Sequence, residues 1–163
     1  MVSDGGVLKR IDYSLIKASN TPSFLAYKSD AQTISDSTNT VVVYNTEAYD
    51  TDSAHDTTTG RFTVPAGEGG KYFFTAGWVL SLVDDGNKCS IAFWKNGSVY
   101  GSPDYNFYTT SSQANQYVYN QVQGILVLEA ADYVTINIYH NNGGDLDTYA
   151  GQNHFGCYKL IGV

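Results

Sequence analysis

The sequence predicts an all-β domain in which two sheets pack as a sandwich, and three observations carry this prediction. Apolar and polar residues alternate with a period of two, most clearly over residues 71–83 and 133–140. Turn-forming sequences such as Asp-Gly-Asn and Asn-Gly separate the alternating runs. Tyrosine, which favours strands, occurs 14 times in the 163 residues. A chain of this length suits one domain with a sizeable core.

Residues 1–22 are predicted to form an arm in front of the domain, which occupies residues 23–163. The Asp-Gly-Gly sequence near the start interrupts regular structure, and a proline closes the segment. Between them, apolar residues recur at spacings of three and four, which is compatible with a short amphipathic helix. An arm that carries apolar residues but no core is a candidate docking element. The candidate docking residues are Val7, Leu8, Ile11, Leu15 and Ile16.

Beyond the arm, the period-two pattern predicts one strand after another. Within the longest run, Tyr72, Phe74 and Trp78 fall on one face of the strand. Phe73 and Val79 fall on the opposite face. In chain order, strand-like runs are expected at residues 40–45, 71–83, 89–95, 124–130 and 133–140.

Glycine-containing turns mark where these strands end. The Lys-Asn-Gly-Ser sequence at 95–98 is the strongest hairpin signal, because Asn-Gly suits a type I′ turn. Similar turn signals stand at 85–87 and 141–144. Short strands joined by such turns are typical of a β-sandwich or barrel, and the form predicted here is a jelly roll.

Charge and hydropathy argue against several classes of partner. The net charge is −7 and the pI is about 4.6, and the nine basic residues are scattered. We therefore expect no nucleic-acid partner and no binding to an anionic membrane surface. No apolar run has the length of a secretory leader or a membrane span. Cys89 and Cys157 lack metal-ligand spacing and are expected to be buried thiols, unless the fold brings their strands together as a disulfide.

An acidic stretch over residues 47–65 raises the question of a metal or catalytic centre. A calcium loop of the EF-hand type starting at Asp50 fails, because Ala54, His55 and Arg61 occupy three required positions. His55 also has no histidine or cysteine neighbour at zinc-binding spacing. No catalytic motif is visible elsewhere in the chain. The sequence therefore predicts a solvated loop, with no metal site, no catalytic residue and no cofactor.

Several short segments follow one another in a characteristic order: Tyr44-Asn45, Thr59–Pro65, Gly70–Phe74, Lys95–Gly97, Leu128–Val134 and Phe155–Leu160. In this order they resemble the C1q-like domain. The closing segment is more similar to the related tumour-necrosis-factor form. The resemblance covers residues 23–163. Each motif is short, but their shared order is specific. Ala131 departs from the pattern, because the family has glycine at this position.

The resemblance implies a ten-stranded jelly roll that assembles as a tight homotrimer. Alternation along the closing strand separates its residues into a core set and an outward set. The alternative is that the tyrosines in question are ordinary core or exposed sheet residues. By resemblance, the residues facing the threefold axis would be Tyr119, Gln121, His154, Tyr158 and Leu160.

Some C1q-like trimers hold calcium near their apex, which draws attention to two acidic turns. Asp84 and Asp85 lie in one turn, and Asp145 and Asp147 lie in another. These turns could converge at one end of the sandwich. The competing interpretation is that aspartate is a common turn residue with no ligand.

C1q-like domains without a collagen stem look like those on virions of tailed bacteriophages. Because the chain starts with Met and has only a short arm and no fibre shaft, we expect a non-enzymatic capsid cement, or decoration, protein. Its partner would be the major capsid protein on the outside of the head, and its location would be the virion. The alternative is a fibre tip that recognises a host-surface glycan through loops such as 104–119. A small hydrolase is a third, disfavoured interpretation.

Overall fold

The computed structural model describes residues 2–4, 7–9, 19–84, 86–101, 107–110 and 116–161. No helix occurs among these residues, so the all-β prediction is confirmed and nothing in this part of the chain forms a membrane-spanning helix. The strands are β1 (Val2–Asp4), β2 (Val7–Lys9), β3 (Ser23–Tyr27), β4 (Thr33–Ile34), β5 (Thr40–Val41), β6 (Thr46–Asp50), β7 (His55–Asp56), β8 (Arg61–Thr63), β9 (Gly70–Val83), β10 (Lys88–Lys95), β11 (Ser98–Val99), β12 (Phe107–Thr110), β13 (Gln116–Leu128), β14 (Tyr133–His140), β15 (Leu146–Asp147) and β16 (His154–Lys159).

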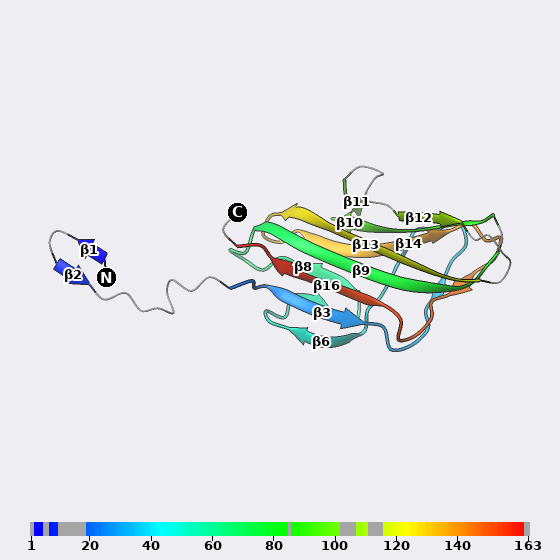
Figure 1. Ribbon diagram of the computed structural model, residues 1–163, viewed down its shortest axis with the longest axis horizontal. Coiled ribbons are helices and arrows are strands. Elements are labelled where there is room, and N and C mark those ends of the chain that lie inside the picture. The colour runs from blue at the N-terminus through cyan, green and yellow to red at the C-terminus, as the bar shows by residue number, and fades with distance from the viewer. Residues whose placement is uncertain are drawn as a thin grey trace.

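Two sheets form the layers of the sandwich (Figure 1). The first has five strands in the order β13-β9-β16-β3-β6. The second has seven strands, with β11-β10-β14-β8-β7 along its path and with β12 and β5 attached to β10 and β14. Strands from the two ends of the domain, β3 and β16, are neighbours and antiparallel. Such pairing between distant strands is typical of a jelly roll.

The register of the five-stranded sheet defines two ends of the molecule. Ser23, where the chain enters the domain, pairs with Tyr158 near the end of β16. Strands β9 and β13 run from this end to the opposite one, where Val83 pairs with Gln116. We call the end at Ser23 the proximal end and the end at Val83 the distal end (Figure 1).

Aromatic rings fill the space between the sheets. Phe24 stacks on Phe62 with ring centroids 5.3 Å apart, and it meets Phe155 edge-on at 4.9 Å. Such ring pairs contribute about 0.5–1.5 kcal/mol each beyond the area they bury. Tyr72, Phe74 and Trp78, which were predicted to share one face of the strand, all point into the core. The largest fully buried rings are Phe24, Tyr44, Phe62, Tyr72, Phe74, Trp78, Phe93 and Phe155.

The predicted hairpin at 95–98 is confirmed, whereas the predicted strand number is not. Asn96 and Gly97 have φ values of 51° and 79°, as a type I′ turn requires, and Lys95 pairs with Ser98 across the turn. The described residues contain sixteen strand segments rather than ten, because short two-residue segments such as β11 follow turns between the long strands.

The helix considered for the arm is wrong where the structure describes the arm. Val7 and Leu8 lie in β2, which pairs with β1 in a two-stranded antiparallel ribbon. A β-branched residue such as Val7 favours the strand, and the ribbon satisfies backbone groups between two short segments. The other predicted docking residues, Ile11, Leu15 and Ile16, lie outside the described residues.

Both cysteines are buried thiols, as predicted. Cys89 lies on β10 in the seven-stranded sheet, and Cys157 lies on β16 in the five-stranded sheet. Burial raises the pKa of Cys89 to about 11 and also raises the pKa of Cys157. Both thiols therefore stay protonated at neutral pH, in keeping with a packing role.

Candidate assembly face

The outward side chains of the five-stranded sheet form a continuous surface, which we call the five-strand face. The strand register sets these side chains in rows across the sheet. Ile125 of β13, Phe73 of β9 and Tyr158 of β16 form one row. The face includes Leu25, Tyr27, Tyr49, Phe73, Thr75, Val79, Tyr117, Tyr119, Gln121, Gln123, Ile125, Val127, His154 and Tyr158.

Large apolar side chains stay exposed on the five-strand face. Tyr119, Ile125 and Val127 on β13 keep 52%, 51% and 52% of their surface exposed. Among the described residues, seven of the ten exposed large hydrophobic side chains lie on strands of this sheet, against one, Val99, on the seven-stranded sheet. Because monomeric proteins seldom expose contiguous apolar patches, this distribution makes the five-strand face the candidate contact surface.

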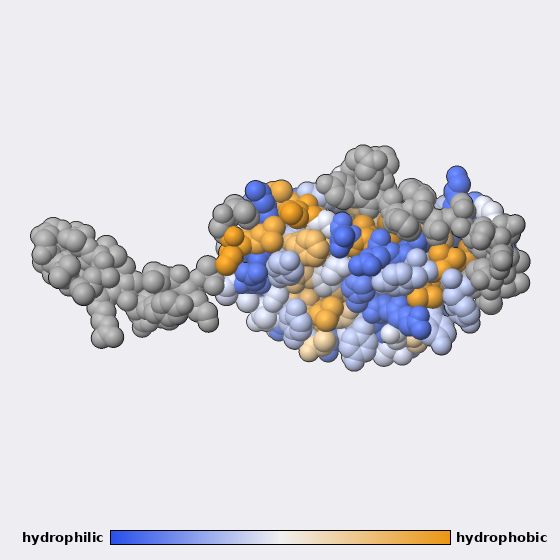
Figure 2. Space-filling view, viewed as in Figure 1, coloured by the Kyte–Doolittle hydropathy of each residue, from blue (hydrophilic) through white to orange (hydrophobic). Residues whose placement is uncertain are grey.

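The apolar side chains gather in the proximal half of the five-strand face. The rings of Phe73 and Tyr158 lie 5.4 Å apart between centroids. Next to them, Leu25 and Tyr49 line a shallow hollow of about 210 Å³. Figure 2 shows the hydrophobic surface concentrated toward this end. Protruding apolar side chains beside a hollow provide the shape complementarity that a protein contact needs.

A polar cluster lies over Gly77 in the middle of the five-strand face. A Cβ at Gly77 would lie 2.6 Å from the Tyr119 hydroxyl and 2.8 Å from His154 Cε1, so these two side chains cover the glycine. The Oγ1 atom of Thr75 is 3.1 Å from His154 Nε2 and 3.5 Å from Gln121 Nε2. Burial lowers the pKa of His154, which favours its neutral form. The cluster is therefore an uncharged hydrogen-bonding centre.

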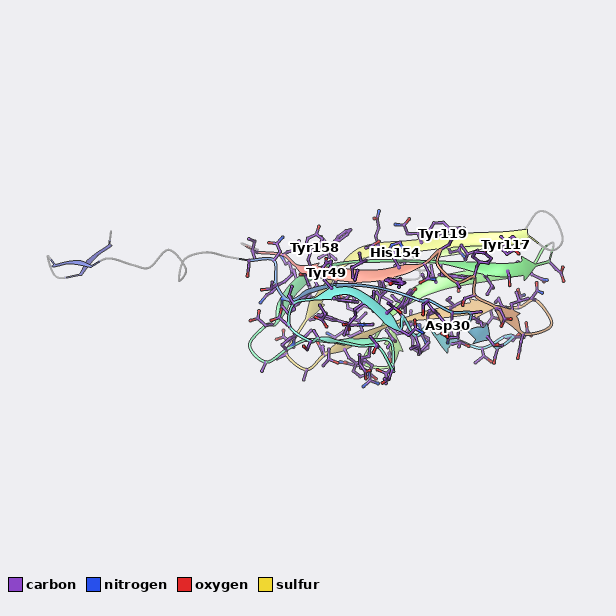
Figure 3. All side chains as sticks on the ribbon, turned by 90° about the horizontal axis from the view of Figure 1, so that it is seen from below. Asp30, Tyr49, Tyr117, Tyr119, His154 and Tyr158 are labelled. Carbon is purple, nitrogen blue, oxygen red and sulfur yellow. The ribbon has the colours of Figure 1, made fainter. Side chains whose placement is uncertain are left out.

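Four of the five residues predicted to face a threefold axis share the five-strand face. Tyr119 and Gln121 come from β13, and His154 and Tyr158 come from β16. Figure 3 shows Tyr158, His154 and Tyr119 following one another along the sheet. Leu160 follows β16, is half-buried, and donates its backbone N–H to a β9 carbonyl at 2.8 Å. Their location at an axis of symmetry stays a prediction.

Sequence reasoning missed the apolar half of this face. Phe73, Ile125 and Val127 lie in runs that were recognised as strands, but their shared surface was not. The signal was present in the period-two pattern of both runs. The pattern could not show that β13 pairs with β9. This pairing joins segments about fifty residues apart and sets Ile125 directly opposite Phe73.

The acidic stretch is folded into the edge of the sandwich, so the predicted solvated loop is wrong for His55. The His55 ring is buried and stacks on Phe24, with centroids 4.7 Å apart. Its backbone N–H donates to Asp50 at 2.8 Å, and its Nδ1 lies 3.3 Å from a Glu47 carboxylate oxygen. Burial lowers the pKa of His55, and Glu47 opposes this effect. The sequence showed the charges but not the aromatic pocket.

Two of the aspartates considered for calcium accept hydrogen bonds from the segment that contains β4. Asp145 accepts the backbone N–H of Asp36 at 2.9 Å, and Asp147 accepts the hydroxyl of Thr33 at 2.8 Å. Asp85 lies outside the described residues. The described contacts match the ordinary role of aspartate as a turn acceptor.

Comparison with known proteins supports the predicted jelly roll. The family model of the C1q domain matches residues 23–159. The chain is similar to the globular domain of zebrafish Complement 1qA protein, with TM-score 0.62, 17% identity, and coverage of 86% of this chain and 98% of that one. It is also similar to murine APRIL, with TM-score 0.61, 13% identity, and coverage of 85% of this chain and 98% of that one. For Eiger TNF from S. frugiperda the TM-score is 0.55 and the identity 16%, with coverage of 86% of this chain and 93% of that one. No curated protein sequence matches the chain.

Proposed function

Because the chain belongs to the C1q domain family, we propose that it is a non-enzymatic module that assembles as a homotrimer through its five-strand face. C1q- and TNF-like domains are generally binding or structural modules, and they commonly form homotrimers. The observation that carries the proposal is the exposure of Tyr119, Ile125 and Val127 on one sheet face. Two further copies of the chain would cover these side chains.

The two halves of the five-strand face have different roles in this proposal. The apolar half, around Phe73 and Ile125, supplies most of the free energy of association, at roughly 25 cal/mol for each Å² of apolar surface removed from water. The polar cluster at His154 and Gln121 sets the register between copies, because buried polar groups must find partners. A neutral His154 avoids the cost of bringing like charges together in the trimer.

We further propose that the trimer decorates the outer surface of a phage head and binds the major capsid protein through residues 1–22. The matched domain starts at residue 23, so the arm precedes it. The arm and the domain also differ in net charge. Three basic and two acidic residues give the arm +1, whereas six basic and fourteen acidic residues give residues 23–163 a charge of −8. Three arms on one trimer would multiply weak contacts.

Trimer formation is tested by sedimentation equilibrium of the full chain over a range of concentrations. The expected mass is three times the 17.8 kDa of one chain. A species of 17.8 kDa at every concentration would overturn the assembly proposal.

Decoration is tested by deleting residues 1–22 and adding the protein to expanded heads that lack it. The shortened chain should keep its mass in sedimentation but no longer appear on heads in electron micrographs, whereas the full chain should coat them. Coating by the shortened chain would show that the arm does not dock. Labelled protein found at a tail tip would favour the receptor-binding alternative.

A further inference from the structure

A second hollow lies at the distal end, away from the apolar half of the five-strand face. Its volume is about 330 Å³, and its described lining residues are Val79, Tyr117, Tyr149 and Gln152. Ligand pockets occupy roughly 300–1,000 Å³, so this hollow suits a small ligand or one unit of a longer one. Figure 3 shows Tyr117 at the opposite end of the sheet from Tyr158.

Two tyrosine rings form the walls of this distal hollow. The rings of Tyr117 and Tyr149 are 5.6 Å apart between centroids and inclined by 80°. In this arrangement the edge of one ring meets the face of the other, so ring surface remains for a ligand. Tyr117 is 63% exposed and Tyr149 is 46% exposed, although both are large apolar rings. The pair therefore presents aromatic surface and two phenolic hydroxyls to the outside.

The loop that carries Tyr149 and Gln152 is held in place by backbone contacts. The N–H of Tyr149 donates to the carbonyl of Val79 at 2.8 Å, which ties the loop to β9. Asn153 Nδ2 and the N–H of Gly151 both donate to the carbonyl of Lys28, at 3.1 and 3.2 Å. A ligand that binds here does not have to order the loop first, which removes part of the entropic cost of binding.

We propose that the distal hollow binds a neutral sugar ring of a surface polysaccharide. A sugar has an apolar C–H face that packs on aromatic rings and a rim of hydroxyls that both donate and accept hydrogen bonds. Tyr117 and Tyr149 supply rings and hydroxyls, and the Gln152 amide donates and accepts. The described lining residues carry no charge, and the acidic domain around them repels anionic glycans.

Other occupants fit the hollow less well. An apolar peptide side chain would need apolar walls, and Val79 is the one aliphatic side chain among the described lining residues. The sugar site shares the five-strand face with the trimer contact, because Tyr117 lies two residues from Tyr119 on β13, so the contact has to end between these two side chains. The sugar site is compatible with capsid docking, because the distal end lies opposite the point where the arm joins the domain at Ser23. A trimer attached through its arms would present three such sites outward.

Binding is tested by probing an array of neutral bacterial surface oligosaccharides, built from hexoses and N-acetylhexosamines, with the full chain. We expect binding to a subset of them, and saturation-transfer NMR with the soluble form of a bound oligosaccharide should show contact with ring protons. Absence of binding to every neutral glycan, or binding to anionic control glycans alone, would overturn the proposal.

Matched variants then test the location of the site. Tyr149→Ala should weaken affinity for the bound oligosaccharide by at least about tenfold, whereas Tyr149→Phe, which keeps the ring, should stay within about threefold. Tyr27→Ala removes an exposed ring of β3 outside the hollow and should leave the sugar affinity unchanged. If Tyr149→Ala alters the sedimentation mass but not sugar affinity, the hollow is a protein contact and the proposal fails. If the protein is a monomer that still binds sugar, the trimer proposal fails and the sugar-site proposal stands.

Discussion

The outward faces of the two sheets differ although both follow the same alternation. The five-strand face carries rings and aliphatic side chains such as Tyr119 and Ile125, which stay half-exposed. On the seven-stranded sheet, the outward positions of β10 and β14 are already covered: Ser90, Ala92, Thr135 and Asn137 are buried, and Trp94 and Tyr139 are half-buried. Alternation alone therefore makes a sheet, and the extent to which its outward side chains are already covered decides whether that sheet still has apolar surface to bury.

The largest expected effect is the loss of assembly on placing a charge in the apolar half of the five-strand face. Ile125→Asp should convert the trimer into a folded monomer of 17.8 kDa, because a carboxylate buried without a partner costs several kcal/mol in each contact. Sedimentation equilibrium measures the mass, and circular dichroism checks that the strands persist.

Val99→Asp is the matched control for the other sheet. Val99 on β11 is 49% exposed, close to the value for Ile125, but it belongs to the seven-stranded sheet. This variant should stay trimeric with stability within about 0.5 kcal/mol of the parent. A trimeric Ile125→Asp, or a monomeric Val99→Asp, would reverse the roles assigned to the two faces.

An intermediate effect is expected from acid, through the two histidines whose pKa burial lowers. His55 and His154 both resist protonation when folded, so the unfolded chain binds protons first as the pH falls below the ordinary value of 6.5. The contribution of these two histidines to the free energy of unfolding is therefore fully present above pH 6.5 and is lost as the pH falls through the lowered folded values. Thermal melting from about pH 8 to about pH 5 measures the loss.

The variant His154→Gln separates the contribution of His154 to this pH dependence from that of the buried His55. The variant keeps a polar side chain on the five-strand face and leaves His55 unchanged, so it should flatten part of the pH dependence but not all of it. An unchanged pH profile would mean that burial does not lower the pKa of His154 in the folded protein.

The smallest effect is expected at the turn that joins the two sheets, between β13 and β14. Ala131 has a φ of 69°, a conformation that costs a residue with a Cβ about 1–2 kcal/mol. Ala131→Gly should raise the free energy of unfolding by up to about 1 kcal/mol, since the greater entropy of unfolded glycine offsets part of the gain. Urea denaturation measures it. A decrease in stability would mean that the turn relies on the methyl group.

Local features of the fold were predictable because their causes are local. Side chains two residues apart on a strand share a face, so Tyr119 and Gln121, or His154 and Tyr158, had to lie together if the strands formed. Asn96 and Gly97 likewise favour their turn through their own tolerance of positive φ. The family resemblance then supplied the jelly roll, which the match over residues 23–159 supports.

Features that depend on which strands meet were not predictable in this way. The burial of His55 depends on Phe24, thirty-one positions earlier in the chain, lying beneath its ring. The distal hollow depends on Tyr117 meeting Tyr149 across two segments that show no common signal. In both cases the two partners lie far apart in the sequence. Neither segment by itself predicts how the strands that carry them pair.

By itself, the sequence determined that this chain forms strands, where several of its turns lie, and that its net charge is acidic, because those properties follow from single residues and their immediate neighbours. Only the tertiary structure decided which outward side chains stay exposed, which histidine is buried and which tyrosines meet. The reason is that burial and contact depend on pairing between distant strands, and that pairing is a property of the whole sandwich.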